Sequence, residues 1–303
     1  MSLTEQLKYQ YRTGGVHIKL IFINVIVYLI FAMILVFMTL MKWDNSTESF
    51  KAFKNIFSFH SNPIEFITKP WGIVTYMFIH GSFFHLFSNM LILFFVGRMY
   101  ENILGSKKTL STFFIGGICG ALLYLITYNI FPLFSDYNDM PVVGASAAVM
   151  AIFVGLATYS PNFEVMLFGL FKVKMKYLAI VWVALDITGL ANNDGIAHFA
   201  HIGGALWGYI FITNYKKGKD LSTWFDKLIL SFQNIFKRNK IKIVYSKGKK
   251  SAPKRTTSDH NYNEDKNNRQ KKVDAILDKI KASGYESLSK EEKNYLFDAS
   301  KNI

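Results

Sequence analysis

The feature that most constrains this chain is a series of apolar runs long enough to cross a lipid bilayer. Residues 20–41 hold only Asn24 and Thr39 as polar interruptions. A hydrocarbon core of about 30 Å needs about 20 apolar residues in a helix. The run is also too long for a removable signal peptide and lacks a small-residue cleavage site. We therefore expect it to remain in the protein as a membrane span.

Five further apolar runs follow and complete an expected bundle of six spans. They cover residues 83–104, 110–131, 146–160, 177–190 and 197–214. The last three are short or rich in small residues, which suits a bundle interior because small side chains let backbones approach closely. The expected fold class is therefore all-α, a polytopic membrane protein with six transmembrane helices.

Loop charges indicate the orientation. Basic residues precede the first span and lie between the second and third spans and between the fourth and fifth. The loops between the third and fourth spans and between the fifth and sixth carry Asp and no base. The positive-inside rule then makes both termini cytoplasmic. Segment 42–82, which contains several phenylalanines, is expected to lie in the opposite interface. Because no organelle-targeting signal is recognisable, we expect a bacterial cytoplasmic membrane.

The polar part of the chain after the last span carries most of the net charge of +14. From residue 215 onward there are 22 Lys and Arg against 11 Asp and Glu. Beside a membrane domain, anionic lipid is the expected partner of such a basic tail, and nucleic acid is not.

The sequence predicts five parts. They are a cytoplasmic N-terminal segment (1–17), the six-span domain (18–214), a juxtamembrane amphipathic segment (215–245), a flexible basic linker (246–272) and a small helical hairpin (273–303). In the hairpin, apolar residues recur at helical spacing until Gly284 interrupts them. Ser289 and Glu292 then have the spacing of a capping box, which predicts the start of a second helix.

Polar side chains that a bilayer disfavours cluster in three of the spans. An ionisable group near the bilayer centre costs about 2.5–3.5 kcal/mol, so each such group is a candidate for function. In the second span His85 and Asn89 are four residues apart and share one helix face. Ser146 opens the fourth span, and His198 and His201 begin the sixth.

These groups match what peptide hydrolysis needs, namely a nucleophile, a base and donors for an oxyanion. Ser146 stands where a loop becomes a helix, whose first turn offers unpaired backbone N–H groups. Gly144 permits a tight turn before it. Gly204 and Gly208 follow His201 on one helix face and would let two spans approach closely enough for a Ser–His hydrogen bond.

Taken singly, each residue also has an ordinary structural explanation. A serine in a membrane helix usually bonds the carbonyl four residues back. Asn89 can join two helices, and a lone histidine is more often a hydrogen-bonding partner than a base. The combination at one depth of three spans favours a site, with Asn89 and His85 as side-chain donors.

Over residues 18–214 the chain resembles the rhomboid family of intramembrane serine proteases. The motifs that carry the resemblance are His85-x-x-x-Asn89, Gly97-x-x-x-Glu101-x-x-x-Gly105-Ser106, Gly144-x-Ser146, and Ala200-His201-x-Gly-Gly204 followed by Gly208. The resemblance, which is to the bacterial type with a C-terminal cytoplasmic extension, implies Ser146 as nucleophile and His201 as general base. Asn89, His85 and the Ser146 N–H would form the oxyanion hole. The implied dyad has no carboxylate, unlike soluble triads.

Some residues remain open or depart from the family pattern. His198 competes with His201 for the role of base, and His80 is expected to support the site near the water access. Gly72 follows Trp71 where family members often have Arg. Asp186, in the fifth span, has no assigned role. No metal or cofactor is expected.

Three functions follow from these observations. The leading one is an intramembrane endopeptidase that cleaves single-span or other transmembrane proteins. The second is a catalytically inactive rhomboid-like protein that binds membrane helices, which the presence of both Ser146 and His201 disfavours. The third is a zinc site or transporter built on the histidines of the spans. No His-Glu-x-x-His motif supports the third. Its four candidate ligands are His80, His85, His198 and His201.

Overall fold

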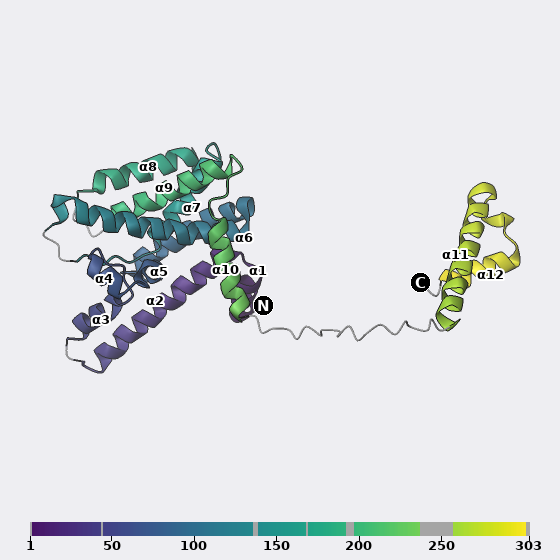
Figure 1. The fold of residues 1–303 in the computed structure, drawn as a ribbon, viewed down its shortest axis with the longest axis horizontal. Helices are drawn as coiled ribbons and strands as arrows, with labels where there is room; N and C mark the ends of the chain where they lie inside the picture. The colour runs from purple at the N-terminus through teal and green to yellow at the C-terminus, as the bar shows by residue number, and fades with distance from the viewer. Residues whose placement is uncertain are drawn as a thin grey trace, which may run out of the picture. The chain divides into compact units, whose positions relative to one another are not determined.

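The computed structural model of the 303-residue chain separates into two compact units, Met1–Arg238 and Asn239–Ile303. It describes residues 2–43, 45–135, 139–167, 169–191, 197–236 and 257–300. Figure 1 shows both units as almost entirely helical, so the helical fold expected from the sequence is confirmed.

The described part of the first unit consists of helices and a short β-hairpin. Its helices are α1 (Leu3–Thr13), α2 (Val16–Leu40), α3 (Ser46–Asn55), α4 (Pro63–Thr68), α5 (Gly72–Thr75), α6 (Phe83–Ile130), α7 (Ser146–Tyr159), α8 (Met175–Gly189), α9 (His198–Tyr215) and α10 (Thr223–Phe236). Two short 3₁₀ turns, η1 (Tyr76–Phe78) and η2 (Pro132–Phe134), lie before α6 and after it. Strands β1 (Glu164–Leu167) and β2 (Phe171–Lys174) pair antiparallel between α7 and α8. This hairpin was not predicted from the sequence, because its strands are only four residues long.

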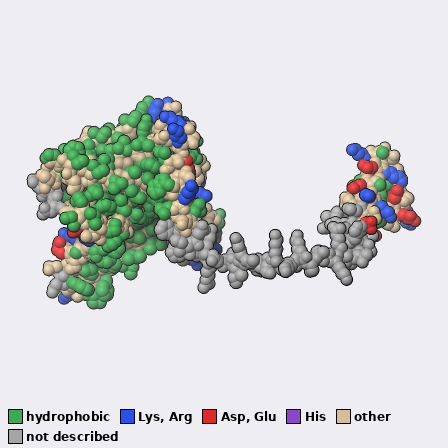
Figure 2. All heavy atoms as spheres, in the orientation of Figure 1, with side chains coloured by type: hydrophobic (Ala, Val, Ile, Leu, Met, Phe, Trp, Pro, Cys, Tyr) green, Lys and Arg blue, Asp and Glu red, His purple; other side chains and the backbone are tan. Residues whose placement is uncertain are grey.

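Helical segments occupy all six of the apolar runs. By length and hydropathy, α2 and α6 are each able to cross a membrane, and α7 is a shorter apolar helix. Only 11% of the most apolar window of α2 is buried. In Figure 2, apolar side chains cover most of the visible face of the first unit. Such a surface suits a lipid environment, because apolar side chains need no hydrogen-bonding partner there.

The long helix α6 is two helices joined at Gly105. This residue has φ 83° and ψ 164°, outside the helical region. The Tyr100 hydroxyl lies 2.7 Å from the Thr112 hydroxyl. In a continuous helix, residues 12 apart would be separated by about 18 Å. The chain therefore reverses at Gly105 and forms the second and third spans.

Substituting Gly105 with alanine is expected to destabilise the membrane unit by about 1–3 kcal/mol, the usual cost of a backbone conformation that only glycine readily adopts. No atom lies within 4 Å of a Cβ placed there, so the effect would come from the backbone alone. Reversible unfolding in mixed detergent measures it. Gly81→Ala is the matched control, because its Cβ also meets open space without a positive φ. Equal stability of the two variants would contradict this explanation.

Helices α6, α7 and α9 contain the core and pack closely against one another. Residues 147–157 of α7 are all buried. Because α7 is apolar around its whole circumference, it is stable only when other helices surround it. This central position holds Ser146, the half-buried first residue of α7, directly beside the core.

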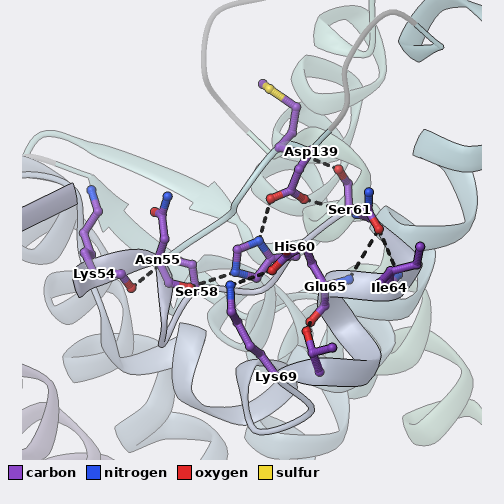
Figure 3. A network of polar contacts seen from close by, with 12 residues as sticks. Lys54, Asn55, Ser58, His60, Ser61, Ile64, Glu65, Lys69 and Asp139 are labelled. Carbon is purple, nitrogen blue, oxygen red and sulfur yellow. Dashed lines mark hydrogen bonds and ion pairs between the residues drawn. The ribbon is translucent and has the colours of Figure 1, made fainter. Parts of the chain in front are cut away.

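Residues 45–82, part of the segment expected at the membrane interface, fold into α3, α4, α5 and η1 and hold the loop that leads to α7 (Figure 3). His60 Nδ1 lies 2.6 Å from Asp139 Oδ2, and the backbone N–H of Asn62 donates to Asp139 Oδ1 at 3.1 Å. The backbone N–H of Met140 donates to the Ser61 hydroxyl at 2.8 Å. Two separate segments are thus joined directly before the turn at Gly144.

Close packing within the same segment explains the departure from the family pattern at Gly72. A Cβ at Gly72 would lie 2.5 Å from the carbonyl oxygen of Ser58, so an arginine does not fit there. Trp71 Nε1 instead donates to the carbonyl of Ile56 at 2.7 Å, and the Thr75 hydroxyl donates to the carbonyl of Phe57 at 2.6 Å. Backbone carbonyls therefore hold this loop together.

At the other end of the unit, α10 is joined to α6 by a half-buried charge cluster. Lys108 Nζ donates to Asp220, to Asp226 at 2.6 Å and to the Ser222 hydroxyl at 2.8 Å. Burial acts to raise the pKa of Asp220, but hydrogen bonds from Lys108 and Ser222 outweigh it and hold that pKa below its usual value. The start of the predicted amphipathic segment is therefore anchored through charge. Its residues 237–245 lie outside the described part of the chain.

The second unit contains α11 (Thr257–Ser283), η3 (Tyr285–Ser287) and α12 (Lys290–Ser300). The predicted capping box is confirmed, because the N–H of Ser289 donates to Glu292 Oε2 at 2.7 Å and the N–H of Glu292 donates to Ser289 Oγ at 3.2 Å. Helix α11 begins inside the stretch predicted to be a linker, of which residues 246–256 lie outside the described part. Its first half is polar, so an apolar repeat does not reveal it.

Candidate active site

The structure brings Ser146 and His201 together at one end of the helix bundle. Ser146 is the first residue of α7, and His201 lies in the first turn of α9. His201 Nε2 lies 2.8 Å from Ser146 Oγ, a hydrogen-bonding distance. His201 is 9% exposed and Ser146 is half-buried, so the histidine lies mostly inside the protein.

Two glycines of α9 permit this approach. A Cβ at Gly204 would lie 2.0 Å from the carbonyl oxygen of Ala147, and one at Gly208 would lie 2.2 Å from that of Ala151. Any larger residue would force α7 and α9 apart. The glycines that follow His201 therefore set the distance between the helices that carry the serine and the histidine.

Gly144 shapes the turn into α7. It has φ +128°, a conformation that residues with side chains rarely adopt, and its N–H donates to the carbonyl of Tyr76 at 2.9 Å. A Cβ at Gly144 would lie 2.6 Å from the His85 ring. The glycine thus serves both the turn and the close approach of His85 to the backbone just before Ser146.

His85 and Asn89 lie on the first part of α6 and face the same region as Ser146. The Asn89 amide nitrogen donates to the carbonyl of His85 at 2.9 Å, a bond that uses one of its two N–H groups. The rings of His80 and His85 contact edge to face, with centroids 5.1 Å apart. The Ala145 N–H approaches His80 Nε2 at 3.5 Å. His80 therefore supports both His85 and the turn.

A cavity of about 490 Å³ opens beside these groups, and its wall contains the proposed nucleophile, base and two side-chain donors, four of the predicted site residues. Part of the apolar surface comes from Trp182 of α8, Tyr124 of α6 and Met140 of the loop between α6 and α7. The polar residues of the wall are Ser88, His85, Asn89, Ser146 and His201. The cavity is large enough for side chains of an extended peptide together with water.

The structure adds a residue that the sequence left without a role. Asp186 Oδ1 lies 2.8 Å from His201 Nδ1 and 2.7 Å from His198 Nδ1. Asp186 is 3% exposed. A carboxylate inside a membrane span is itself a signal of function, but its partners become visible only when α8 packs against α9.

The residues with metal-ligand spacing in the structure differ from the four histidines considered from the sequence. Within the described ranges, one group of side chains has the spacing of metal ligands. It consists of Asp186, His198 and His201, whose ligand atoms lie within 4.8 Å of one another. Neither His80 nor His85 belongs to this group. The same three atoms also have the hydrogen-bonding geometry described above.

Fold and site together define a helical membrane protein that carries a Ser–His pair in the wall of a cavity. Residues 68–217 match the family model described as the Rhomboid domain. The chain belongs to the rhomboid family. Residues 256–302, which include α11 and α12, match a separate family of unknown function, DUF6576.

Proteins with similar sequences carry rhomboid names. "Rhomboid-like protease 3" of Toxoplasma gondii is 30% identical over 156 residues, which cover 51% of this chain and 56% of that protein. "Presenilin-associated rhomboid-like protein, mitochondrial" of Bos taurus is 27% identical, covering 51% and 40%. "RHOMBOID-like protein 12, mitochondrial" of Arabidopsis thaliana is 28% identical, covering 48% and 47%. The chain spans about half the length of these relatives.

Proposed function

We propose that this protein is an intramembrane serine endopeptidase that cleaves transmembrane-anchored proteins. The observation that carries the proposal is the 2.8 Å contact between Ser146 Oγ and His201 Nε2 in the wall of an open cavity. A serine hydroxyl is a weak nucleophile until a neighbouring base takes its proton. The hydrogen bond to His201 provides that base.

In the proposed reaction, Ser146 Oγ attacks the scissile carbonyl while His201 Nε2 takes the hydroxyl proton. Negative charge develops on the carbonyl oxygen of the tetrahedral intermediate. Asn89, His85 and the backbone N–H of Ser146 are the proposed donors to that oxygen, because all three groups lie at this end of the cavity. His201 then gives the proton to the leaving amine, and water hydrolyses the acyl-enzyme.

The substrate must lose its helical structure around the scissile bond. In a membrane helix each amide is hydrogen-bonded and its carbonyl is shielded by side chains. We therefore propose substrates whose cleaved segment holds small or helix-breaking residues. Such a segment unwinds at low cost and fits a cavity of about 490 Å³.

Both termini are proposed to face the cytoplasmic side. The loops rich in Lys and Arg lie on the same side of the six spans as the termini, and such loops are usually cytoplasmic. The basic tail would then lie next to anionic lipid. Two of the relatives named above are called mitochondrial. A bacterial membrane therefore gains no support from the comparisons, and the proposal is limited to multi-pass insertion with this orientation.

The test uses the detergent-solubilised full chain and a single-span model substrate with a Gly-containing membrane segment. We expect cleavage within that segment, insensitivity to a metal chelator, and a covalent adduct on Ser146 after treatment with a fluorophosphonate. Chelator-sensitive cleavage without an adduct would overturn the serine mechanism and favour metal chemistry at the Asp186–His198–His201 group. Binding of the substrate without cleavage or adduct would favour the inactive helix-binding protein.

A further inference from the structure

We propose that Asp186 is a positioning residue that extends the Ser146–His201 pair to a Ser–His–Asp arrangement. This inference rests on the proposed proteolytic function and goes beyond the carboxylate-free dyad that the family resemblance implies. Asp186 does not contact the reacting atoms. It acts through His201, whose two ring nitrogens face Asp186 on one side and Ser146 on the other.

The contacts of Asp186 determine which nitrogen of His201 carries the proton. An ionised carboxylate only accepts hydrogen bonds, so at 2.8 Å from Asp186 Oδ1 the Nδ1 atom of His201 must be the donor. In the neutral ring, Nε2 then holds the lone pair. This atom lies 2.8 Å from Ser146 Oγ, so the ring is in the tautomer that a general base requires.

Asp186 also stabilises the charge that forms during the reaction. When His201 takes the serine proton it becomes an imidazolium, and the carboxylate oxygen lies 2.8 Å from its Nδ1. Both groups are at least nine-tenths buried, with Asp186 3% and His201 9% exposed. Burial strengthens the attraction between opposite charges, because less water screens it.

His198 also contacts the same carboxylate oxygen. His198 Nδ1 lies 2.7 Å from Asp186 Oδ1 and approaches it from the start of α9. A Cβ at Gly189 would lie 2.3 Å from the His198 ring, so glycine makes room for this ring. Within the described part of the chain, the other oxygen, Oδ2, is buried without a hydrogen-bonding partner. The carboxylate is therefore directed toward the two histidines.

The first experiment compares Asp186→Asn with wild type in the same cleavage assay. The asparagine amide can donate to Nδ1, which shifts the proton of His201 to Nε2 and leaves Ser146 without a base. We expect kcat to fall about 10²-fold or more, within the usual range for loss of general-base catalysis. KM and the unfolding midpoint should change little, because the substitution keeps the shape of the side chain.

His198→Ala is the matched control, since it removes the other hydrogen bond between α9 and the same carboxylate. If Asp186 only joins α8 to α9, both variants should lose kcat to a similar extent. We expect His198→Ala to keep kcat within about tenfold of wild type, because His201 retains its own bond to Asp186. Equal losses in the two variants would overturn the positioning role.

A spectroscopic readout that needs no activity completes the test. ¹⁵N NMR of histidine-labelled protein, with the His201 signals assigned from a His201→Gln sample, reports which ring nitrogen is protonated. We expect Nδ1–H in wild type and a shift toward Nε2–H in Asp186→Asn. An unchanged tautomer with unchanged kcat would overturn the inference alone. Failure of wild type to cleave any substrate would instead overturn the proposed function, whatever the tautomer.

Discussion

Replacing Ser146 with alanine is expected to reduce substrate cleavage to the background of the assay, a loss of at least about 10³-fold in kcat. The substitution removes only the hydroxyl, which lies 2.8 Å from His201 Nε2. The backbone turn at Gly144 and the buried body of α7 do not depend on that oxygen. The variant should therefore fold and bind substrate normally, so that the loss reports on the nucleophile. Cleavage is measured from the release of the labelled product.

His201→Ala should give a loss of the same order, and the double variant should be no slower than either single one. Groups that act as one catalytic unit show such non-additivity, because the base has no effect on catalysis once the nucleophile is absent, and the reverse. Independent roles would instead make the two losses multiply. His198→Ala tests the choice between the two histidines. Full loss in that variant with activity retained in His201→Ala would assign the base to His198.

Sequence patterns were enough to predict those features that depend only on residues close together along the chain. The apolar runs reveal the spans because hydrocarbon thickness fixes their length. The capping box at Ser289 is visible because its two hydrogen bonds join residues three apart. The turn at Gly144 was predicted as well, since a glycine two residues before a helix indicates a tight turn, and the structure shows this turn with a positive φ.

The rest could not be predicted, because it depends on which distant segments meet. Asp186 lies fifteen residues before His201 along the chain, and only the packing of α8 against α9 brings their side chains together. Gly72 has no room for an arginine side chain because the carbonyl of Ser58, which belongs to a separate turn, lies against it. Helix α11 begins in a polar stretch without apolar periodicity. The dyad implied by resemblance therefore lacked the carboxylate that the structure places beside it.

Gly204→Ala is expected to lower kcat about 10²-fold although residue 204 touches neither the serine nor the substrate. The new methyl group would stand 2.0 Å from the carbonyl oxygen of Ala147, the residue directly after Ser146. Backbone atoms on both helices meet there, so no flexible side chain can move aside. Helix α9 must therefore shift away from α7, and a displacement of about 1 Å between reacting groups typically costs about 10²-fold in rate.

Overpacking at this position should also lower the free energy of unfolding by about 1–3 kcal/mol. Leu206→Met on the same helix is the matched control, because Leu206 is 49% exposed and the replacement nearly conserves volume. Unfolding in mixed detergent and the cleavage rate are measured on both variants. If Gly204→Ala lost stability but kept kcat, the spacing of α7 and α9 would not control the serine–histidine pair. A loss of both kcat and stability that Leu206→Met does not show would support the role of Gly204 in setting the distance between nucleophile and base.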